Sequence, residues 1–353
     1  MPLSLSELDQ TILIPPGAQA PLKGRDAECA HVFADKEAGE ASLKDDSKAI
    51  NELQDKLWGE RNRALLVVLQ GIDTSGKDGT VRGVFDRCGP LGVGVTAFGK
   101  PNEEELAHDY LWRVHRAVPK KGMIGVFNRS HYEDVLVVKV RGLAPAEAIA
   151  QRYAQINDFE RHLVENGTTV LKFMLHISKE EQRERLQQRL DDPAKHWKFN
   201  PSDLEDRKLW DEFHAAYDVM LERTSTAHAP WRIIPADKKW RRNAIIAAVV
   251  RATLESMAPS YPPAAFDPAS ASPDDAALLA FETQWGEEDK PTRRDLPRLN
   301  PEERALYDDL RDNRLRKELR LEQERIGFGW VEAAIAKLQD ANGPGGPADR
   351  HPR

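Results

Sequence analysis

One apolar run that ends in a glycine-rich turn constrains this chain most: LLVVLQGIDTSGKDGT, residues 65–80. The run is typical of a buried strand. After it, Gly71 is followed by four residues and then by Gly76 and Lys77, which is the spacing of a phosphate-binding loop. In such a loop, backbone N–H groups surround phosphate oxygens, the helix that follows directs its positive end at them, and the lysine adds a full charge. The sequence therefore predicts a strand, a phosphate-binding loop and a helix that begins near Lys77.

Two carboxylates make this loop unusual. Asp78 occupies the position after Lys77, where such loops usually place a serine or threonine hydroxyl on magnesium, and Asp73 lies within the loop. When donor and acceptor are both phosphates, carboxylates at the loop edge can hold hydrated Mg²⁺ between the two chains. Asp73 could also orient the attacking phosphate oxygen or accept its proton. Asp78 is open to a second interpretation, as a favourable acid in the first turn of a helix.

Short apolar segments alternate with helical patterns along residues 42–257. The expected strands cover residues 64–70, 94–98, 123–127, 169–177 and 231–234. The expected helices cover residues 42–60, 77–87, 103–117, 146–165, 179–190, 204–223 and 239–254. Five short apolar strands separated by helices predict an α/β fold with a five-stranded parallel sheet that is covered on both faces.

A second polar loop, NRSHYEDV, follows the third expected strand. In open parallel sheets the reactive ends are the carboxyl ends of the strands, so this loop is of equal interest. Arg129 can bind two phosphate oxygens at once, and Glu133 and Asp134 follow it closely. Asn128 stands where ordinary phosphate-loop enzymes place a magnesium-binding aspartate. The plainer interpretation of these residues is a surface ion pair and an exposed loop.

A basic segment follows the fourth expected strand. It carries Arg185 and Arg189, four positions apart and hence on one helical face, and then Lys195 and Lys198 around Trp197. A polar, positively charged excursion between two helices suits a lid that closes over phosphates and excludes water. A solvated charged helix is the alternative interpretation.

Charge and hydropathy limit the partners. The 353-residue chain has a net charge of -7, which argues against general nucleic-acid binding, although a local basic groove can coexist with it. No apolar run approaches the roughly 20 residues that a membrane span needs, and the N-terminus lacks the pattern of a secretory signal. His131, His176 and His196 do not form a convincing metal set. With only two cysteines, the sequence predicts a cytoplasmic protein that binds no nucleic acid and no membrane.

The sequence divides into five expected parts. An N-terminal extension covers residues 1–41, and the phosphate-binding domain covers residues 42–257. Residues 258–299, rich in Pro, Ala, Ser and Asp, are expected to form a linker. Residues 300–340 combine dense charges with leucines at near-helical spacing, which predicts a helical extension that packs on the core or on another subunit. Residues 341–353 are expected to be disordered.

Five segments together resemble the family-2 polyphosphate kinases, in order and at matching spacing. They are GIDTSGKDG, FGKPNEEELAHDYLWRVH, GVFNRSHYEDVLVV, KFMLHISKEEQRERLQQRLDDPAKHWKF and APWRIIPADKKWRRN, within residues 30–257. The resemblance implies a thymidylate-kinase-like P-loop fold, a three-layer sandwich with a helical lid. It also implies Mg²⁺-dependent phosphoryl transfer from inorganic polyphosphate to a nucleotide, with Mn²⁺ as an alternative metal.

The resemblance carries roles onto residues of this chain. It implies catalytic roles for Asp73, Lys77, Arg129 and Asp134, with the metal held by Asp73 and Asp134. The phosphates of the donor are expected to contact Gly71, Ser75, Gly76, Lys77, Lys100, Arg129, Arg185, Arg189, Lys195 and Lys198. The acceptor nucleotide is expected to contact Asp73, Asn128, His131 and Glu133.

One departure from the commoner family pattern bears on the acceptor. Many members have an aspartate in place of Asn128 and a tryptophan in place of His131, and FNRSHYED resembles the branch that accepts nucleoside monophosphates as well as diphosphates. This favours conversion of AMP to ADP and of ADP to ATP, with GMP and GDP as further acceptors, and Glu133 as the residue that favours the shorter acceptor. The resemblance also implies a homodimer or homotetramer. Two alternatives stay open: an ATP-dependent nucleotide kinase of the same fold, and a non-catalytic protein that uses this loop for binding.

Overall fold

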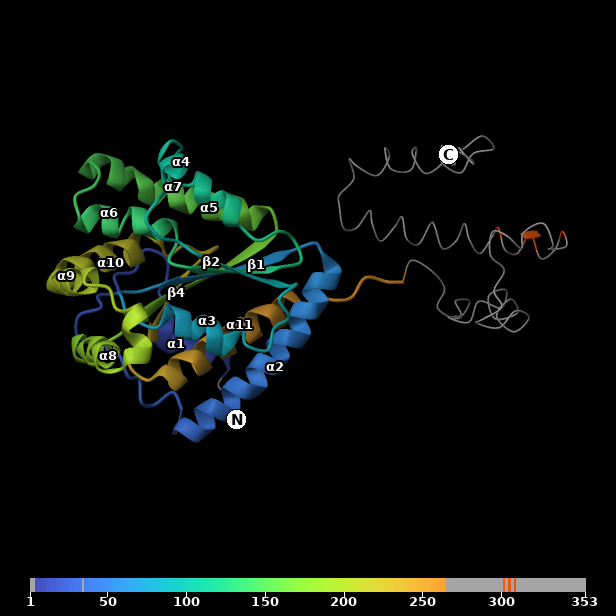
Figure 1. Ribbon diagram of the computed structural model, residues 1–353, viewed down its shortest axis with the longest axis horizontal. Helices are drawn as coiled ribbons and strands as arrows, with labels where there is room; N and C mark the ends of the chain where they lie inside the picture. The colour runs from blue at the N-terminus through green and yellow to red at the C-terminus, as the bar shows by residue number, and fades with distance from the viewer. Residues whose placement is uncertain (1–3, 34, 265–300, 302–303, 306–307, 309–353) are drawn as a thin grey trace, which may run out of the picture. The chain divides into compact units, whose positions relative to one another are not determined.

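A five-stranded parallel sheet forms the centre of the fold (Figure 1). The computed structural model describes residues 4–33, 35–264, 301, 304–305 and 308. The strands are β1 (Ala64–Gln70), β2 (Val93–Ala97), β3 (Ile124–Asn128), β4 (Thr168–His176) and β5 (Trp231–Pro235). They lie in the order β2–β3–β1–β4–β5, and every neighbouring pair is parallel. The predicted α/β fold with a five-stranded parallel sheet is confirmed.

Helices cover both faces of this sheet. The α-helices are α1 (Leu5–Ile12), α2 (Lys36–Glu60), α3 (Lys77–Val84), α4 (Glu103–Leu106), α5 (Trp112–Ala117), α6 (Val137–Val140), α7 (Ala146–Glu165), α8 (Lys179–Asp191), α9 (Ser202–Lys208), α10 (Trp210–Thr224) and α11 (Lys239–Met257), and the 3₁₀ helices are η1 (His131–Asp134) and η2 (Pro193–Lys198). Figure 1 shows α1, α2, α3 and α11 on one side of the sheet and α5, α6, α7 and α10 on the other. Within the described residues, each helix is too short or too polar to span a lipid bilayer.

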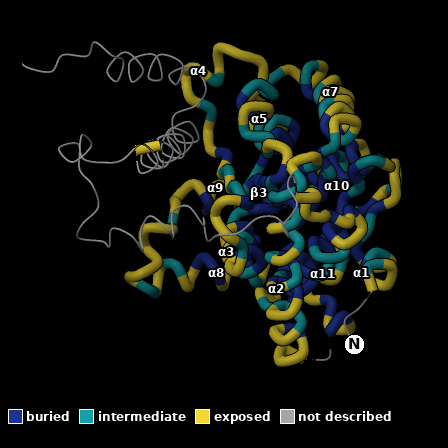
Figure 2. Tube along the Cα trace, turned by 90° about the vertical axis from the view of Figure 1, so that its right-hand side faces the viewer, coloured by how far each residue is buried: buried dark blue, intermediate teal, exposed yellow. Residues whose placement is uncertain are grey.

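The central strand β1 is buried along its whole length, and its side chains from Ala64 to Leu69 are apolar on both faces of the sheet. Figure 2 shows the buried residues gathered around β3 and the exposed ones on the outer turns of the helices. Near the carboxyl end of β1, Leu69 pairs with Asn128 of β3 and Gln70 pairs with Met174 of β4. The loops that follow β1 and β3 therefore leave the sheet at the same edge.

Much of the predicted N-terminal extension packs into the core. Leu8, Ile12 and Ile14 are each at most 2% exposed. The Ile14 N–H donates to the Trp231 carbonyl oxygen at 2.9 Å, which adds one backbone contact to the outer side of β5. The helix predicted from residue 42 begins earlier, at the start of α2, because the Asp35 carboxylate caps its first turn.

Two predicted helices are each divided. Residues 103–117 contain α4 and α5, separated by a turn in which the Asp109 carboxylate accepts from the Leu111 N–H at 3.0 Å. Such a local bond competes with the helical hydrogen bonds. Residues 204–223 belong to α9 and α10, which are separated at Leu209.

The chain divides after Pro263 into two units, and the sheet belongs to the first. Of the predicted linker and helical extension, the structure describes residues 258–264, 301, 304–305 and 308. The remainder of residues 258–340, and the tail predicted as disordered, lie outside the described residues.

Candidate functional site

The phosphate-binding loop lies between β1 and α3, where the sequence predicts it. Gly71 leaves no room for a side chain, because a Cβ there would lie 2.6 Å from Ser75 Oγ and 2.7 Å from the Leu175 carbonyl oxygen. Lys77 is buried, and its Nζ donates to the Gly71 carbonyl oxygen at 2.6 Å. Its ammonium therefore lies inside the loop, beside the positive end of α3.

Two buried arginines hold the other side of this loop. Arg185 donates to the carbonyl oxygens of Thr74 at 2.8 Å and Ser75 at 3.2 Å, and Arg242 also donates to the Ser75 carbonyl oxygen, at 3.2 Å. A carbonyl and the next N–H point in opposite directions across a trans peptide. Fixing the Ser75 carbonyl therefore directs the Gly76 N–H away from the arginines. The two side chains determine how the loop presents this donor.

Arg185 and Arg242 make contacts that the sequence did not predict. Arg185 was expected to contact the donor phosphates, but its guanidinium also donates to the carbonyl oxygens of Ala236 and Asp237 and to the Glu181 carboxylate. Its hydrogen bonds are thus directed at the protein. Arg242 was not predicted as a site residue, although the basic run WRRN at the start of α11 indicated that cations gather there. Burial and Arg185 lower the pKa of Arg242 to about 9, so its guanidinium is charged at neutral pH.

Asp73, Lys77, Arg129 and Glu133 meet at the shared edge of β1 and β3. Arg129 has a left-handed backbone with φ of +63° and forms an ion pair with Asp73. The Gln70 amide nitrogen donates to Glu133 Oε1 at 3.0 Å. In this orientation the amide oxygen accepts from the loop that follows β3. Burial raises the pKa of Glu133, whereas Arg129 and Lys77 oppose this rise. The structure thus brings together the two loops that the sequence singled out.

Asn128 and Asp78 add a second contact between these loops. Asn128 Nδ2 donates to Asp78 Oδ1 at 2.5 Å, from the end of β3 to the first turn of α3. Asp78 is therefore an acid in the first turn of a helix and, at the same time, a link between the two loops.

Two other predicted site residues, both in η1, contact side chains of α7. Asp134 Oδ1 lies 3.3 Å from Nη1 of Arg152 in α7. His131 has no exposed surface, and its Nε2 lies 3.2 Å from Glu160 Oε1. Consecutive side chains of a 3₁₀ turn leave the backbone in different directions, so Glu133 can face the phosphate-binding loop while its neighbours do not.

Asp73 and Asp78 line the cleft and offer carboxylate oxygens, the ligand type that Mg²⁺ prefers. Mg²⁺ in phosphoryl-transfer sites usually binds one or two carboxylates together with substrate phosphates and water. Asp134 pairs with Arg152, and the metal pair of Asp73 and Asp134 stays a prediction. Among the described residues, no group of three or more His, Cys, Asp and Glu side chains is arranged to hold a metal by itself.

A cleft of about 510 Å³ opens above the two loops. Of the expected donor contacts on the lid, Arg185, Arg189, Lys195 and Lys198 line this cleft. Lys100 is exposed and does not belong to the lining. The basic lid predicted from the sequence therefore faces the phosphate-binding loop.

Asp203 is an acidic residue of the lid that was not predicted as part of the site. It lines the same cleft, and its Oδ2 accepts from Arg189 Nη1 at 3.0 Å. Burial and Asp73 raise the pKa of Asp203 to about 6, in spite of Arg189. The sequence did not set Asp203 apart, because the same polar segment also carries Asp191 and Asp192.

Comparisons with known proteins identify the family to which this site belongs. The family described as Polyphosphate kinase 2 (PPK2) matches residues 33–262. The AMP/ADP-polyphosphate phosphotransferase of Meiothermus ruber is 50% identical over 250 residues, which cover 70% of this chain and 94% of that protein. The ADP-polyphosphate phosphotransferase of Rhodopseudomonas palustris is 40% identical over 242 residues, which cover 65% of this chain and 84% of that protein.

The solved structure of polyphosphate kinase 2 from Arthrobacter aurescens TC1 matches with a TM-score of 0.72 and 42% identity, over 79% of this chain and 97% of that chain. A second family, described as Wadjet protein JetD, C-terminal, matches residues 266–335, which lie largely outside the described residues. The first family match covers more than half of the chain and includes both loops and the lid. The chain therefore belongs to the polyphosphate kinase 2 family.

Proposed function

We propose that this protein transfers a phosphoryl group from inorganic polyphosphate to AMP and ADP, giving ADP and ATP. The proposal rests on the cleft that Asp73, Lys77 and Arg129 line together with the cations of the lid. A repeating polyanion offers no base to recognise, so it must be held by charge, and the cleft supplies cations from α8, η2 and α11. The relatives named as AMP/ADP- and ADP-polyphosphate phosphotransferases support the same reaction.

Catalysis in this proposal rests on positioning and on charge neutralisation, as in phosphoryl transfer generally. Lys77 and the loop N–H groups bind the transferred phosphoryl, and Arg129 spans two of its oxygens. Asp73 orients the attacking phosphate oxygen of the acceptor. Asp73 and Glu133 would hold Mg²⁺, or Mn²⁺ in its place, and the metal would supply positive charge that offsets the charge of the phosphates.

The acceptor side of the site consists of Asp73, Asn128 and Glu133. We propose AMP and ADP as acceptors, with GMP and GDP as alternatives. We expect the affinity for polyphosphate to fall as the salt concentration rises, because polyanion binding releases counterions. We also propose that the enzyme works in the cytoplasm as a homodimer or homotetramer.

The test supplies purified protein with Mg²⁺, long-chain polyphosphate and AMP, without ATP, and follows ADP and ATP by chromatography. Lys77→Ala and Asp73→Asn should abolish both products. Lys48→Ala, at an exposed lysine of α2, is the matched control and should retain them. Activity with ATP alone as the donor would instead indicate a nucleotide kinase of the same fold. Binding of polyphosphate without turnover would indicate a non-catalytic protein.

A further inference from the structure

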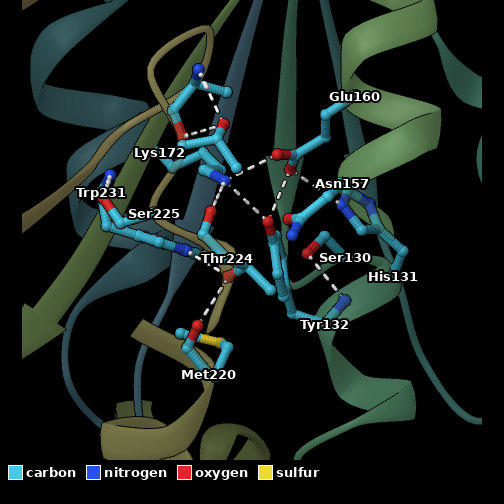
Figure 3. A network of polar contacts seen from close by, with 12 residues as sticks. Ser130, His131, Tyr132, Asn157, Glu160, Lys172, Met220, Thr224, Ser225 and Trp231 are labelled. Carbon is cyan, nitrogen blue, oxygen red and sulfur yellow. Dashed lines mark hydrogen bonds and ion pairs between the residues drawn. The ribbon is translucent and has the colours of Figure 1, made fainter. Parts of the chain in front are cut away.

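A buried polar network lies directly behind η1 (Figure 3). At its centre, Lys172 of β4 and Glu160 of α7 form an ion pair with an N–O distance of 2.6 Å, and neither side chain is exposed. Lys172 Nζ also donates to the Tyr132 hydroxyl at 2.8 Å and to the Thr224 carbonyl oxygen at 2.7 Å. All three N–H groups of the ammonium are therefore used.

Glu160 holds two adjacent residues of η1. Its Oε1 accepts from the Tyr132 hydroxyl at 2.6 Å and contacts His131 Nε2 at 3.2 Å. Figure 3 shows the Glu160 carboxylate between these two side chains and Lys172. The turn is thus fixed from inside the protein, through charge-assisted hydrogen bonds that tolerate little displacement.

Stability alone does not explain this arrangement. A buried ion pair is often no better for stability than well-packed apolar residues of similar size. Burial by itself would raise the pKa of Glu160, but Lys172 and His131 lower it and keep the carboxylate charged. The network instead determines the position of η1, because its hydrogen bonds form in only one placement of the turn.

The same turn presents its other side to the reaction site. Glu133 follows the two held residues, and its Oε1 lies 3.0 Å from the side-chain amide of Gln70, the last residue before the phosphate-binding loop. The phosphate-binding loop has further supports of its own, from Arg185 and Arg242. A shift of η1 would therefore move the acceptor side of the site more than the donor side.

We infer that Glu160 and Lys172 are positioning residues, which fix Glu133 for the acceptor phosphate through Tyr132 and His131. The inference rests on the proposed function. It assigns a role in acceptor binding to two residues that have no exposed surface.

The experiment compares Glu160→Gln with Asp46→Asn. Asp46 is similarly buried and pairs with Arg251 at 3.1 Å, but it joins α2 to α11, away from η1. Both variants should lower the melting temperature. Only Glu160→Gln should raise the KM for AMP, by about 10- to 100-fold, as loss of a positioning contact typically does. Its KM for polyphosphate should stay within about twofold of the wild type, because the donor side keeps its own supports.

Tyr132→Phe keeps the inference testable if Glu160→Gln does not fold. It removes one hydroxyl and leaves the Lys172–Glu160 pair in place, so we expect a KM for AMP raised by about two- to tenfold, the worth of one hydrogen bond. Equal changes in both KM values, or an unchanged KM for AMP, would overturn the inference. If the wild type shows no polyphosphate-dependent transfer, the proposed function fails and the inference falls with it. An active wild type with unaltered variants refutes the inference alone.

Discussion

The guanidinium of Arg242 occupies the space that a side chain at Gly76 would need. A Cβ at Gly76 would lie 1.7 Å from Arg242 Nη1 and 2.7 Å from its Cζ. Gly76 also has a φ of +104°, which L residues rarely adopt. The phosphate-binding loop and the last helix of the domain are therefore fitted to one another at a glycine.

Gly76→Ala should abolish transfer, because the new methyl group displaces Arg242 and the loop carbonyl that it binds. We expect a loss of kcat of at least about 100-fold and a fall in the free energy of unfolding of about 1–3 kcal/mol. Gly142→Ala is the control, since Gly142 has a φ of +62° but no atom near its Cβ position. It should lose stability and keep its kcat, as measured by denaturant unfolding and steady-state kinetics. Equal kinetic losses in both variants would contradict this account.

Arg242→Lys should lower kcat by about tenfold or more while the protein stays folded. Lysine keeps the charge but cannot reproduce a planar guanidinium that reaches both the Ser75 carbonyl and Asn243. Arg241→Lys provides the comparison, because Arg241 is also buried but donates to the Glu28 carbonyl oxygen at 2.8 Å. A kcat that falls as much in Arg241→Lys as in Arg242→Lys would count against a specific role of Arg242.

Glu133→Gln and Asp134→Asn should have different effects on kinetics, although the two acids are adjacent. The charges of Arg129 and Lys77 act on the Glu133 carboxylate, so its loss should reduce kcat/KM for AMP by about 10- to 100-fold. Asp134→Asn should stay within about threefold of the wild type, because Asp134 pairs with an arginine of α7. The reverse order would favour the metal pair of Asp73 and Asp134 that the sequence predicted.

Asp203 should make polyphosphate binding depend on pH. Since its pKa is raised to about 6, the folded protein binds this proton more tightly than the unfolded chain does. Ionised Asp203 therefore opposes folding above pH 6, and this effect is relieved as the pH falls through 6. Protonation also weakens the pair with Arg189 and frees that guanidinium for phosphate.

From pH 7.5 to pH 5.5 we expect the KM for polyphosphate to fall by about two- to fivefold, the worth of a partly exposed ion pair. Asp203→Asn should have the lower KM already at the higher pH and should show less of this dependence. Polyphosphate itself titrates identically with both proteins, so the ratio of their KM values isolates the contribution of Asp203. A ratio that does not change with pH would refute the prediction.

The sheet could be predicted because its signals are local. Residues 64–69 are apolar throughout, and a glycine loop begins at Gly71, so the strand is specified by adjacent residues. The N-terminal segment was harder to place. Leu8 and Ile12 acquire their partners only through contacts with distant parts of the chain, which no periodicity reveals.

The candidate site could be predicted in part, for a similar reason. Asp73, Lys77 and Arg129 follow directly after strands, where parallel topology brings loops together. Arg242 contacts Ser75 across 167 positions, and its role depends on how α11 crosses behind the loop. Whether Glu133 or Asp134 belongs to the site depends on the direction of side chains in a single 3₁₀ turn. A sequence specifies that direction only through the network that holds the turn.

The contact between α1 and β5 has a consequence for synthesis. Asp9 and Arg232 share two hydrogen bonds, at 2.7 and 2.9 Å, across 223 positions of the chain. At about 5–20 residues per second, the ribosome needs roughly 10 to 45 s to produce one partner after the other. During that time the apolar side chains of α1 lack their native cover and are exposed to chaperones and to aggregation. Residues 5–14 are thus made early and reach their native positions late.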